Sequence, residues 1–257
     1  MVSVEEWRIC GSEITMLRVF TAFSGYDSQC LALDRLHKDF GFEYELVGWS
    51  EIDKYAIQAH NALYPQWADR NYGDISKIDW SQVPDFDLFT YSSPCQDFSN
   101  AGKQAGGEKG SGTRSSLLWE CERAIAAKKP KYLLMENVAA LVSKKFLPLF
   151  NEWRALLNQY GYTSFAEVLN AKDYGVPQNR ERVFLVSILR DETDKFPHYY
   201  FPKPFKLEKR LKDVLEENVD EKYYLSDKMI QCFETRTQIA KEKGNGFRFS
   251  PTDGGVC

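Results

Sequence analysis

Short apolar segments alternate with longer segments of helical periodicity along most of the chain, and this alternation limits the fold more than any other feature. Strands are expected near residues 17–23, 45–50, 69–72, 86–91, 131–136, 163–169 and 183–189. Helices are expected near residues 28–40, 53–63, 115–128, 146–159 and 226–242. Strands separated by helices pair in parallel with helices on both faces, so the pattern predicts an α/β protein with a doubly wound, mostly parallel sheet. The last two strands, around Gly161 and Gln178, are expected to form a terminal antiparallel hairpin.

The composition is that of an ordinary globular protein. The chain has 257 residues, of which 43% are hydrophobic and 14% aromatic, enough to bury one sizeable core. No apolar run is long enough to span a bilayer, and the N-terminus lacks a basic segment followed by an apolar one, so a cytoplasmic protein without membrane contact is expected. The six cysteines form no CxxC pair and no zinc-ligand spacing with histidine, so free thiols and no metal site are expected.

Residues 86–104 lead an apolar strand directly into a Ser-Pro-Cys turn, and Cys95 lies in that turn. Ser99, Gly102 and Lys103 follow in a polar loop. A cysteine at the carboxyl end of a central strand is placed to act as a nucleophile. A free cysteine is also commonly a small buried hydrophobe, and the turn alone leaves both interpretations open.

Two later segments place charged side chains beside apolar strands. Glu136 lies where the strand of residues 131–136 meets its loop, the position at which open α/β sheets place ligand-binding groups. Arg180 and Arg182 precede the strand of residues 183–189 and, being two residues apart, share a face of an extended segment. Each has an ordinary interpretation, a helix cap or surface residue for Glu136 and a solvated edge for the arginines. Their combination with Cys95 is far rarer than any one of the three.

In order and spacing, the chain resembles the DNA cytosine-5 methyltransferases over roughly residues 16–215. The segments that carry the resemblance are Leu17-Arg-Val-Phe-Thr-Ala-Phe-Ser-Gly25, Ser50-Glu-Ile-Asp-Lys-Tyr-Ala56, Gly73-Asp-Ile75, Pro94-Cys-Gln96, Glu136-Asn-Val138, Gln178-Asn-Arg-Glu-Arg182 and Phe201-Pro-Lys-Pro-Phe205. The resemblance implies a Rossmann-like S-adenosylmethionine-dependent methyltransferase fold.

The resemblance also implies roles for the charged segments. Cys95 would add to carbon 6 of cytosine, because a thiolate is the best side chain for pushing electron density onto carbon 5. Glu136 would hold N3 and the exocyclic amine, and Arg182 the base O2, with Arg180 nearby. The target base must leave the duplex for this chemistry, and the glycine-rich loop from Gln96 to about Arg114 is expected to close over it. The expected DNA-binding residues are Gln96, Ser99 and Lys103.

S-adenosylmethionine is the methyl donor that the resemblance implies. Glu51, at the end of the second strand, is expected to hold the ribose hydroxyls, and Asp74 to contact the adenine amine, although Asp is also common as a turn or helix cap. Ile52 stands where the family often has an aromatic residue that stacks on adenine. Ala22 and Ser24 stand where glycines are common in the family's cofactor turn. The expected cofactor-binding residues are Phe20, Ser24, Gly25, Glu51, Ile52, Asp74, Ile75, Pro94 and Leu117.

The charge is unevenly distributed along the chain. The net charge is −4, whereas DNA-binding domains tend to be basic. Residues 1–100 carry 16 acidic and 7 basic side chains, and residues 101–257 carry 21 and 26. This asymmetry fits phosphate contacts confined to one face and a double-stranded DNA partner, although lysine-rich faces are usually just solvated.

Three parts are expected in the domain organisation. Residues 1–15 are a short extension, residues 16–205 the catalytic and cofactor-binding domain, and residues 206–257 a connector with the start of an incomplete target-recognition region. Family members continue with a recognition domain and a last Gly-Asn motif. The resemblance therefore implies either an enzyme split between two polypeptides, with the second as a partner, or a truncated chain.

Three functions stay open on the sequence alone. The first is a DNA cytosine-5 methyltransferase of bacterial or phage origin, serving restriction-modification or protecting phage DNA. The second is a tRNA cytosine-5 methyltransferase, which shares the nucleophile and the cofactor pocket. The third is an inactive remnant that binds cofactor or nucleic acid, and the presence of Cys95, Glu136 and Arg182 together argues against it.

Overall fold

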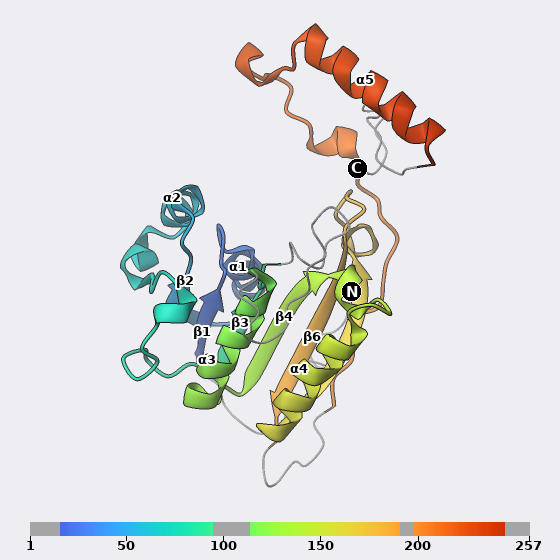
Figure 1. The fold of residues 1–257 in the computed structure, drawn as a ribbon. Coiled ribbons are helices and arrows are strands. Elements are labelled where there is room, and N and C mark those ends of the chain that lie inside the picture. The colour runs from blue at the N-terminus through green and yellow to red at the C-terminus, as the bar shows by residue number, and fades with distance from the viewer. Residues whose placement is uncertain (1–15, 95–113, 191–197, 245–257) are drawn as a thin grey trace. The chain divides into compact units, whose positions relative to one another are not determined.

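A six-stranded sheet with the strand order β2-β1-β3-β4-β6-β5 organises the chain (Figure 1). The computed structural model describes residues 16–94, 114–190 and 198–244. The chain divides into a first unit, residues 1–169 with 182–201, and a second unit, residues 170–181 with 202–257. The strands are β1 (Leu17–Ala22), β2 (Tyr44–Ser50), β3 (Leu88–Tyr91), β4 (Tyr132–Val138), β5 (Tyr162–Asn170) and β6 (Glu181–Leu189).

The sheet is parallel on one side and antiparallel on the other. β1 pairs in parallel with β2 and β3, β3 pairs in parallel with β4, and β4 pairs antiparallel with β6. Between β5 and β6, Arg190 N donates to Gly161 O at 2.9 Å, and the hydroxyls of Ser164 and Ser187 lie 2.7 Å apart. The partner of Gly161 is Arg190 and the partner of Ser164 is Ser187, so the two strands run in opposite directions. β5 and β6 therefore form an antiparallel hairpin. The doubly wound, mostly parallel sheet with a terminal hairpin is confirmed.

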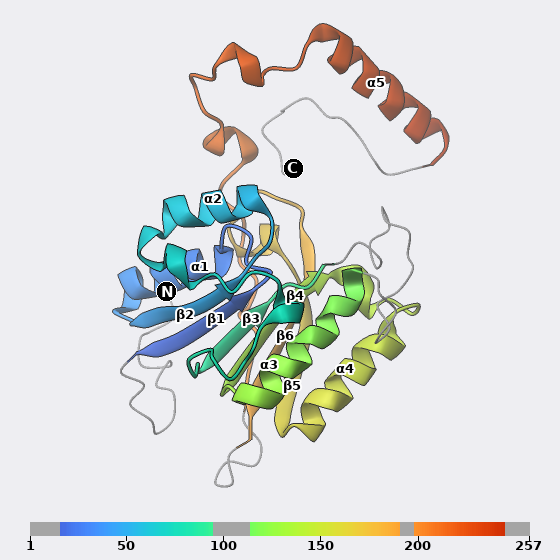
Figure 2. The ribbon, with the colours of Figure 1, turned by 60° about the vertical axis from the view of Figure 1, so that its left-hand side comes forward.

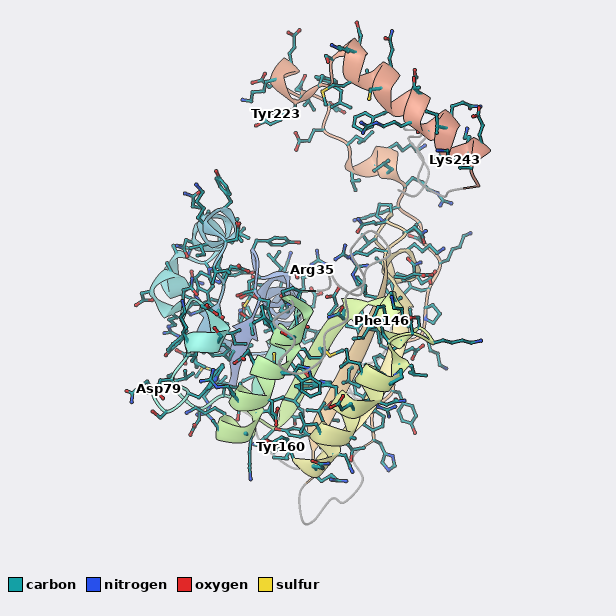
Figure 3. All side chains as sticks on the ribbon, viewed as in Figure 1. Arg35, Asp79, Phe146, Tyr160, Tyr223 and Lys243 are labelled. Atoms are coloured by element: carbon teal, nitrogen blue, oxygen red, sulfur yellow. The ribbon has the colours of Figure 1, made fainter. Side chains whose placement is uncertain are left out.

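Helices cover both faces of the sheet (Figure 2). α1 (Ser28–Phe40) and α2 (Lys54–Leu63) pack on one face, and α3 (Glu120–Lys128) and α4 (Leu147–Gln159) on the other. Alternate strand residues supply the two cores, because successive side chains of a strand point to opposite faces. The core beneath α1 and α2 includes Leu17, Val19, Leu46, Trp49 and Tyr64. The core beneath α3 and α4 includes Phe20, Phe89, Ile125, Leu133, Trp153 and Leu185. Phe146 and Tyr160 flank the two ends of α4 (Figure 3).

Two expected elements differ from the structure. The expected strand at residues 69–72 is wrong, because Pro65–Arg70 form a 3₁₀ helix with proline in its first turn, and Asn71 makes only an isolated bridge to Trp49. The helix expected from residue 115 begins as α-helix at Glu120, after a 3₁₀ segment at Arg114–Trp119. Within the described residues, no helix combines the length and the apolar character needed to cross a bilayer.

The second unit contains the tip of the β5–β6 hairpin and the C-terminal helix. Phe205 N donates to Asp173 O at 2.9 Å, and the Tyr174 hydroxyl donates to Pro202 O at the same distance, so the tip is joined to the chain that follows. α5 (Asp227–Glu242) confirms the helix expected near residues 226–242. The expected domain boundary at residues 205–206 stays a prediction.

Candidate active site

An ion pair between β4 and β6 joins two of the expected catalytic side chains. Arg182 Nε lies 2.9 Å from Glu136 Oε1. Val138 is the residue directly opposite Arg182 in the antiparallel ladder, and Phe184 is opposite Glu136, so Glu136 and Arg182 are diagonal neighbours on one face. Each side chain keeps 24% of its surface exposed. The pair is therefore held by the sheet and is open to a ligand on one side.

The chemistry of this pair suits a polar heterocycle. A carboxylate held by a guanidinium keeps lone pairs for a second donor, and arginine presents several N–H groups in a fixed planar fork. A planar ring with adjacent donors and acceptors matches such a pair. Arg180 lies in the second unit and its side chain is exposed, so its expected place near the base stays a prediction.

Asn137 ties the end of β4 to the turn that follows β3. Its Nδ2 donates to Ser93 O at 3.1 Å and to Ser93 Oγ at 3.2 Å, and both side chains are buried. Its Oδ1 accepts from Val138 N at 2.9 Å. The backbone just before Pro94 is therefore fixed beside Glu136. Sequence reasoning gave Asn137 no role, although a polar residue two positions after Met135, on the same face of an apolar strand, was a usable signal.

Four expected site residues fall outside the described residues. These are Cys95, Gln96, Ser99 and Lys103. Pro94, the last described residue before them, is half-buried. The three cysteines that the described part of the chain contains, Cys30, Cys121 and Cys232, are free thiols.

The loop between β1 and α1 takes a left-handed backbone at three alternate positions. These are Phe23 (φ 55°), Gly25 (φ 59°) and Asp27 (φ 68°). Ala22 ends β1, and neither Ala22 nor Ser24 has a positive φ, so neither position needs glycine for its backbone. That both stand where the family commonly has glycine stays a prediction. Ser24 contributes differently, through its N–H and its hydroxyl, which both donate to Ser50 O at 3.3 and 3.2 Å.

Glu51 links this loop to the start of α2. Its Oε2 accepts from Gly25 N at 2.9 Å, and its Oε1 accepts from Ile52 N at 2.8 Å and Asp53 N at 2.9 Å. The carboxylate is half-buried, whereas the Ile52 side chain is 72% exposed. A Cβ added at Gly25 would meet no atom within 4 Å, so there is open space next to the loop. An acidic acceptor, an exposed apolar side chain and open space beside a glycine fit a nucleoside with free ribose hydroxyls.

Two of the expected cofactor-binding side chains are closed to a ligand. Phe20 is fully buried, and its ring packs against Tyr72, Trp80, Phe86 and Phe89. Its backbone lies in a strand that pairs on both sides. The Ile75 side chain is 3% exposed in the same core. Both side chains are corrected to core residues, because they point to the sheet face that α3 and α4 cover.

Phe23 is an aromatic residue of the loop that sequence reasoning missed. It is half-buried, packs against the core at the end of β1, and directly precedes Ser24 and Gly25. An aromatic residue immediately before the Ser-Gly pair was the available signal.

Asp74 acts as a cap in the structure. Its Oδ1 accepts from Ser76 N at 3.0 Å and Ser76 Oγ at 2.7 Å at the start of a 3₁₀ turn. These hydrogen bonds from Ser76 hold the pKa of the Asp74 carboxyl below its usual value. The interpretation of Asp74 as a cap is therefore correct, and its second oxygen, Oδ2, lies 3.6 Å from Lys77 Nζ. Leu117 is half-buried in the 3₁₀ segment before α3.

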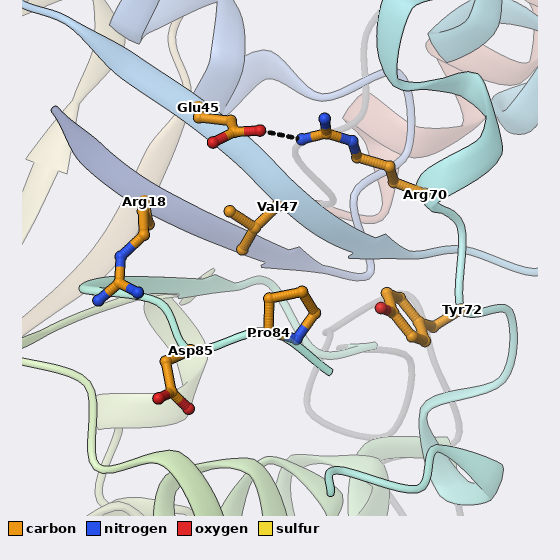
Figure 4. Close-up of a pocket in the computed structure, with 7 residues that line it drawn as sticks. All are labelled: Arg18, Glu45, Val47, Arg70, Tyr72, Pro84 and Asp85. Atoms are coloured by element: carbon orange, nitrogen blue, oxygen red, sulfur yellow. Dashed lines mark hydrogen bonds and ion pairs between the residues drawn. The ribbon is translucent and has the colours of Figure 1, made fainter. Parts of the chain in front are cut away.

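A pocket of about 460 Å³ lies away from these side chains, toward the amino ends of β1 and β2 (Figure 4). It is lined by Arg18, Glu45, Val47, Arg70, Tyr72, Pro84 and Asp85. Its arginines are paired, Arg70 with Glu45 at 2.7 Å and Arg18 with Asp87 at 3.1 Å. Ligands of open α/β sheets bind beyond the carboxyl ends of the strands, and Arg18 and Glu45 are near the amino ends. The pocket is therefore separate from the candidate active site.

A comparison with the models of known protein families shows the family to which the chain belongs. The family described as C-5 cytosine-specific DNA methylase matches residues 17–253. The chain belongs to this family. The cofactor of C-5 cytosine methylases is S-adenosylmethionine, and the loops around Gly25 and Glu51 fit it.

Curated relatives are bacterial and phage methyltransferases. The chain is 40% identical to the type II methyltransferase M2.ScrFI of Lactococcus lactis subsp. cremoris, over 84% of this chain and 72% of that protein. It is 37% identical to the orphan methyltransferase M.SPRI of Bacillus phage SPR, over 82% of this chain and 52% of that protein. The methylase chain thus spans about half the length of some relatives and nearly three quarters of others. The comparisons give no support to the expected second polypeptide.

Solved structures of the same fold include Dnmt2 proteins. Dnmt2 of S. pombe matches with a TM-score of 0.63 at 20% identity, covering 86% of this chain and 66% of that one. DNMT2 of Spodoptera frugiperda matches with a TM-score of 0.65 at 21% identity, covering 86% and 65%. At this identity the likeness shows the fold, which is that of Rossmann-like methyltransferases.

Proposed function

We propose that this methylase transfers a methyl group from S-adenosylmethionine to carbon 5 of cytosine in DNA, through a covalent adduct of Cys95, in a bacterial or phage-infected cell. The observation that carries the proposal is the Glu136–Arg182 ion pair, beside the Asn137–Ser93 contact that fixes the backbone two residues before Cys95. A type II methyltransferase of Lactococcus lactis and an orphan methyltransferase of Bacillus phage SPR among the relatives support restriction-modification or phage DNA protection as its context.

The proposed reaction begins with the Cys95 thiolate. Its Sγ forms a bond to carbon 6 of the cytosine, and the electron pair of the 5,6 double bond moves to carbon 5 and into the ring. Glu136 holds N3 and the exocyclic amine, and Arg182 holds O2, so the negative charge that develops in the ring is stabilised. S-adenosylmethionine, when bound, would supply an electrophilic methyl group, which carbon 5 takes while the electron pair of the broken sulfur–carbon bond stays with the departing S-adenosylhomocysteine. Water then accepts the proton of carbon 5, and the electron pair of that C–H bond re-forms the 5,6 double bond as the Cys95 thiolate leaves carbon 6.

The cytosine must leave the base stack to reach these side chains. The Glu136–Arg182 pair is part of a sheet, and a base that remains stacked in a duplex does not expose both N3 and O2 to one protein site. Base flipping costs a few kcal/mol, which contacts to the flanking DNA must offset. Gln96, Ser99 and Lys103 are our candidates for such contacts.

Covalent trapping tests the proposal directly. DNA of random sequence is synthesised with 5-fluorocytosine in place of cytosine, because fluorine at carbon 5 blocks the final proton loss and leaves the adduct in place. The wild-type chain with S-adenosylmethionine should form a complex that survives denaturing electrophoresis. Cys95→Ser should form none, since a hydroxyl of nearly the same size is a far poorer nucleophile.

Two controls separate the alternatives. Cys121→Ser, which changes a buried cysteine of α3, should leave trapping intact. A matching transcript of tRNA with 5-fluorocytosine should not be trapped. Persistent trapping by Cys95→Ser would mean that the nucleophile is another residue, and trapping of tRNA in place of DNA would select the tRNA function.

A further inference from the structure

A buried carboxylate and a buried imidazole meet beneath the β1–α1 loop. Asp27 and His60 are both fully buried, and His60 Nε2 lies 3.5 Å from Asp27 Oδ2. Neither residue belongs to the catalytic pair or to the expected cofactor contacts. A buried charge is costly unless it is paired or hydrogen-bonded, so this contact requires a physical reason.

Asp27 occupies a backbone conformation that a glycine would adopt without strain. Its φ of 68° is left-handed, a region that Asp enters more readily than most residues but still at a cost. Its carboxylate is held by Thr21 Oγ1, which donates to Oδ2 at 2.7 Å, and by Cys30 N, which donates to Oδ1 at 3.3 Å. Asp27 is thus the N-cap of α1 and the end of the loop that begins after β1.

His60 reaches Asp27 from α2. Its ring stacks on Trp49 at 3.7 Å between centroids, with an interplanar angle of 18°, and lies 5.5 Å from the ring of Tyr64. Among the described residues, neither ring nitrogen meets hydrogen-bond geometry, so the contact to Asp27 is a long polar one, in which Nε2 can present an N–H to Oδ2 at 3.5 Å. Burial and the nearby Asp27 raise the pKa of the Cys30 thiol, so Cys30 stays neutral and His60 is the basic group that faces the carboxylate.

The His60–Asp27 contact adds a second connection between two loops that are already joined. Ser24 and Gly25 donate to Ser50 O and to the Glu51 carboxylate. His60 of α2 meets Asp27 at the other end of the β1–α1 loop, so the loop has two separate connections to the segment of Glu51 and α2. Because α2 begins at Lys54, with Asp53 as its N-cap directly after Ile52, moving α2 would also move Glu51 and Ile52.

We propose that His60 is a positioning residue of the cofactor pocket, which acts through Asp27 to hold the β1–α1 loop in its left-handed form beside Glu51. The inference rests on the proposed binding of S-adenosylmethionine at this loop. The ordinary alternative is a core histidine that contributes only packing, and it predicts that any side chain of similar shape serves equally well.

Two substitutions separate positioning from packing. His60→Phe keeps a flat ring on Trp49 but presents only carbon to Asp27. His60→Gln loses the stacked ring but keeps an N–H donor at nearly the same reach. Calorimetry with S-adenosylmethionine on the full chain should show about tenfold weaker binding for His60→Phe and no more than about a threefold change for His60→Gln. The packing alternative expects the opposite order.

A double-mutant cycle identifies Asp27 as the intermediary. Asp27→Gly tolerates the left-handed backbone and removes the carboxylate. In the Asp27→Gly background, His60→Phe should cause no further loss of affinity, because the charge that His60 serves is gone. If His60→Phe alone does not fold, because the buried Asp27 carboxylate then faces only carbon, the double variant should still fold, since it lacks that carboxylate. A loss of similar size in both backgrounds, or a double variant that does not fold, would overturn the inference.

Hydrogen exchange gives a reading that needs no cofactor. The Gly25 amide, which is bonded to Glu51, should exchange faster in His60→Phe than in wild type or His60→Gln. Equal exchange in all three, with equal affinities, would overturn the role of His60 and leave the proposed function standing. Failure of the wild-type chain to bind S-adenosylmethionine would overturn both.

Discussion

At the scale of single residues, Glu51 makes the most contacts of the expected cofactor pocket. Its carboxylate accepts from three backbone N–H groups, those of Gly25, Ile52 and Asp53. Glu51→Ala should weaken S-adenosylmethionine binding by about 1.5–3 kcal/mol, the usual loss for hydrogen bonds to a charged group. Calorimetry on the full chain measures this. Glu45→Ala changes a glutamate at the other end of β2, paired with Arg70, and should leave the affinity unchanged. An effect of equal size from both would remove Glu51 from the pocket.

Glu136 allows a second prediction at this scale. Glu136→Gln keeps the size of the side chain and its place beside Arg182, but an amide can neither carry the negative charge nor exchange a proton with the base, as the proposed role of Glu136 requires. Methyl transfer in single turnovers should fall by about 10²–10⁴-fold, the usual contribution of a general acid–base group. The variant should still fold, with unchanged S-adenosylmethionine binding.

A matched control for Glu136→Gln is available on β5. Glu167 is an exposed residue of that strand, so Glu167→Gln should leave methyl transfer unchanged. A Glu136→Gln variant as fast as wild type would mean that Glu136 does not hold the base.

The proximity of Glu136 and Arg182 could be anticipated from the sequence, whereas their roles stay predictions. Both lie near the ends of apolar strands, β4 and β6, and the length of an apolar run can be read without tertiary contacts. His60 and Asn137 were missed because their importance arises from burial against residues far away in the chain. Phe20 was misassigned because the face to which a strand residue points depends on which helices cover that face.

At the scale of elements, Asn137 joins the end of β4 to the turn after β3. Asn137→Ala would leave Ser93 O and Oγ without their donor in a buried place, which costs about 1–3 kcal/mol. The free energy of unfolding in urea should fall by this amount. Trapping on fluorinated DNA should also slow, because the turn before Cys95 is no longer fixed beside Glu136.

Asn158→Ala provides the comparison. Asn158 makes its side-chain hydrogen bond to Arg190 at an exposed place, at 2.9 Å. Its removal should change the free energy of unfolding by less than about 1 kcal/mol and leave trapping untouched. If Asn137→Ala behaved in the same way, the contact to Ser93 would have no part in placing the turn.

Helices and strands with a clear hydrophobic period were predicted well, whereas the edge segment that depends on a single backbone pairing was not. β1 to β6 and the five α-helices were foreseen within a few residues, except that α3 begins later. The failed strand at residues 69–72 overlaps the end of a 3₁₀ helix that Pro65 favours, and it contacts β2 through one bridge, in which Tyr72 N donates to Trp49 O at 2.8 Å. One bridge does not make a strand, and the sequence alone does not reveal how many partners an edge segment will find.

At the scale of the whole molecule, the two units differ in how much they bury. Trp49, Trp153 and Tyr91 are almost completely enclosed in the first unit. In α5, the described residue classed as buried is Thr237, while Met229 and Ile239 keep 47% and 44% of their surface exposed. Ile230, Phe233 and Ala240 are half-buried on the same stripe as Thr237, which is a smaller buried face than that of α4. The local stability of α5 should therefore be lower than that of α4.

Hydrogen exchange of the full chain tests this difference with α4 as the matched helix. α4 has 13 residues and α5 has 16, so length alone would favour α5. α4 buries Trp153 and Leu157, and its central amides should exchange only through the large openings that expose the core. The central amides of α5 should exchange at least about 100-fold faster, because a helix that buries little of its surface opens without disturbing the sheet. Equal protection of both helices would contradict this, since it would mean that the half-buried stripe of α5 stabilises that helix as much as the buried face of α4 stabilises α4.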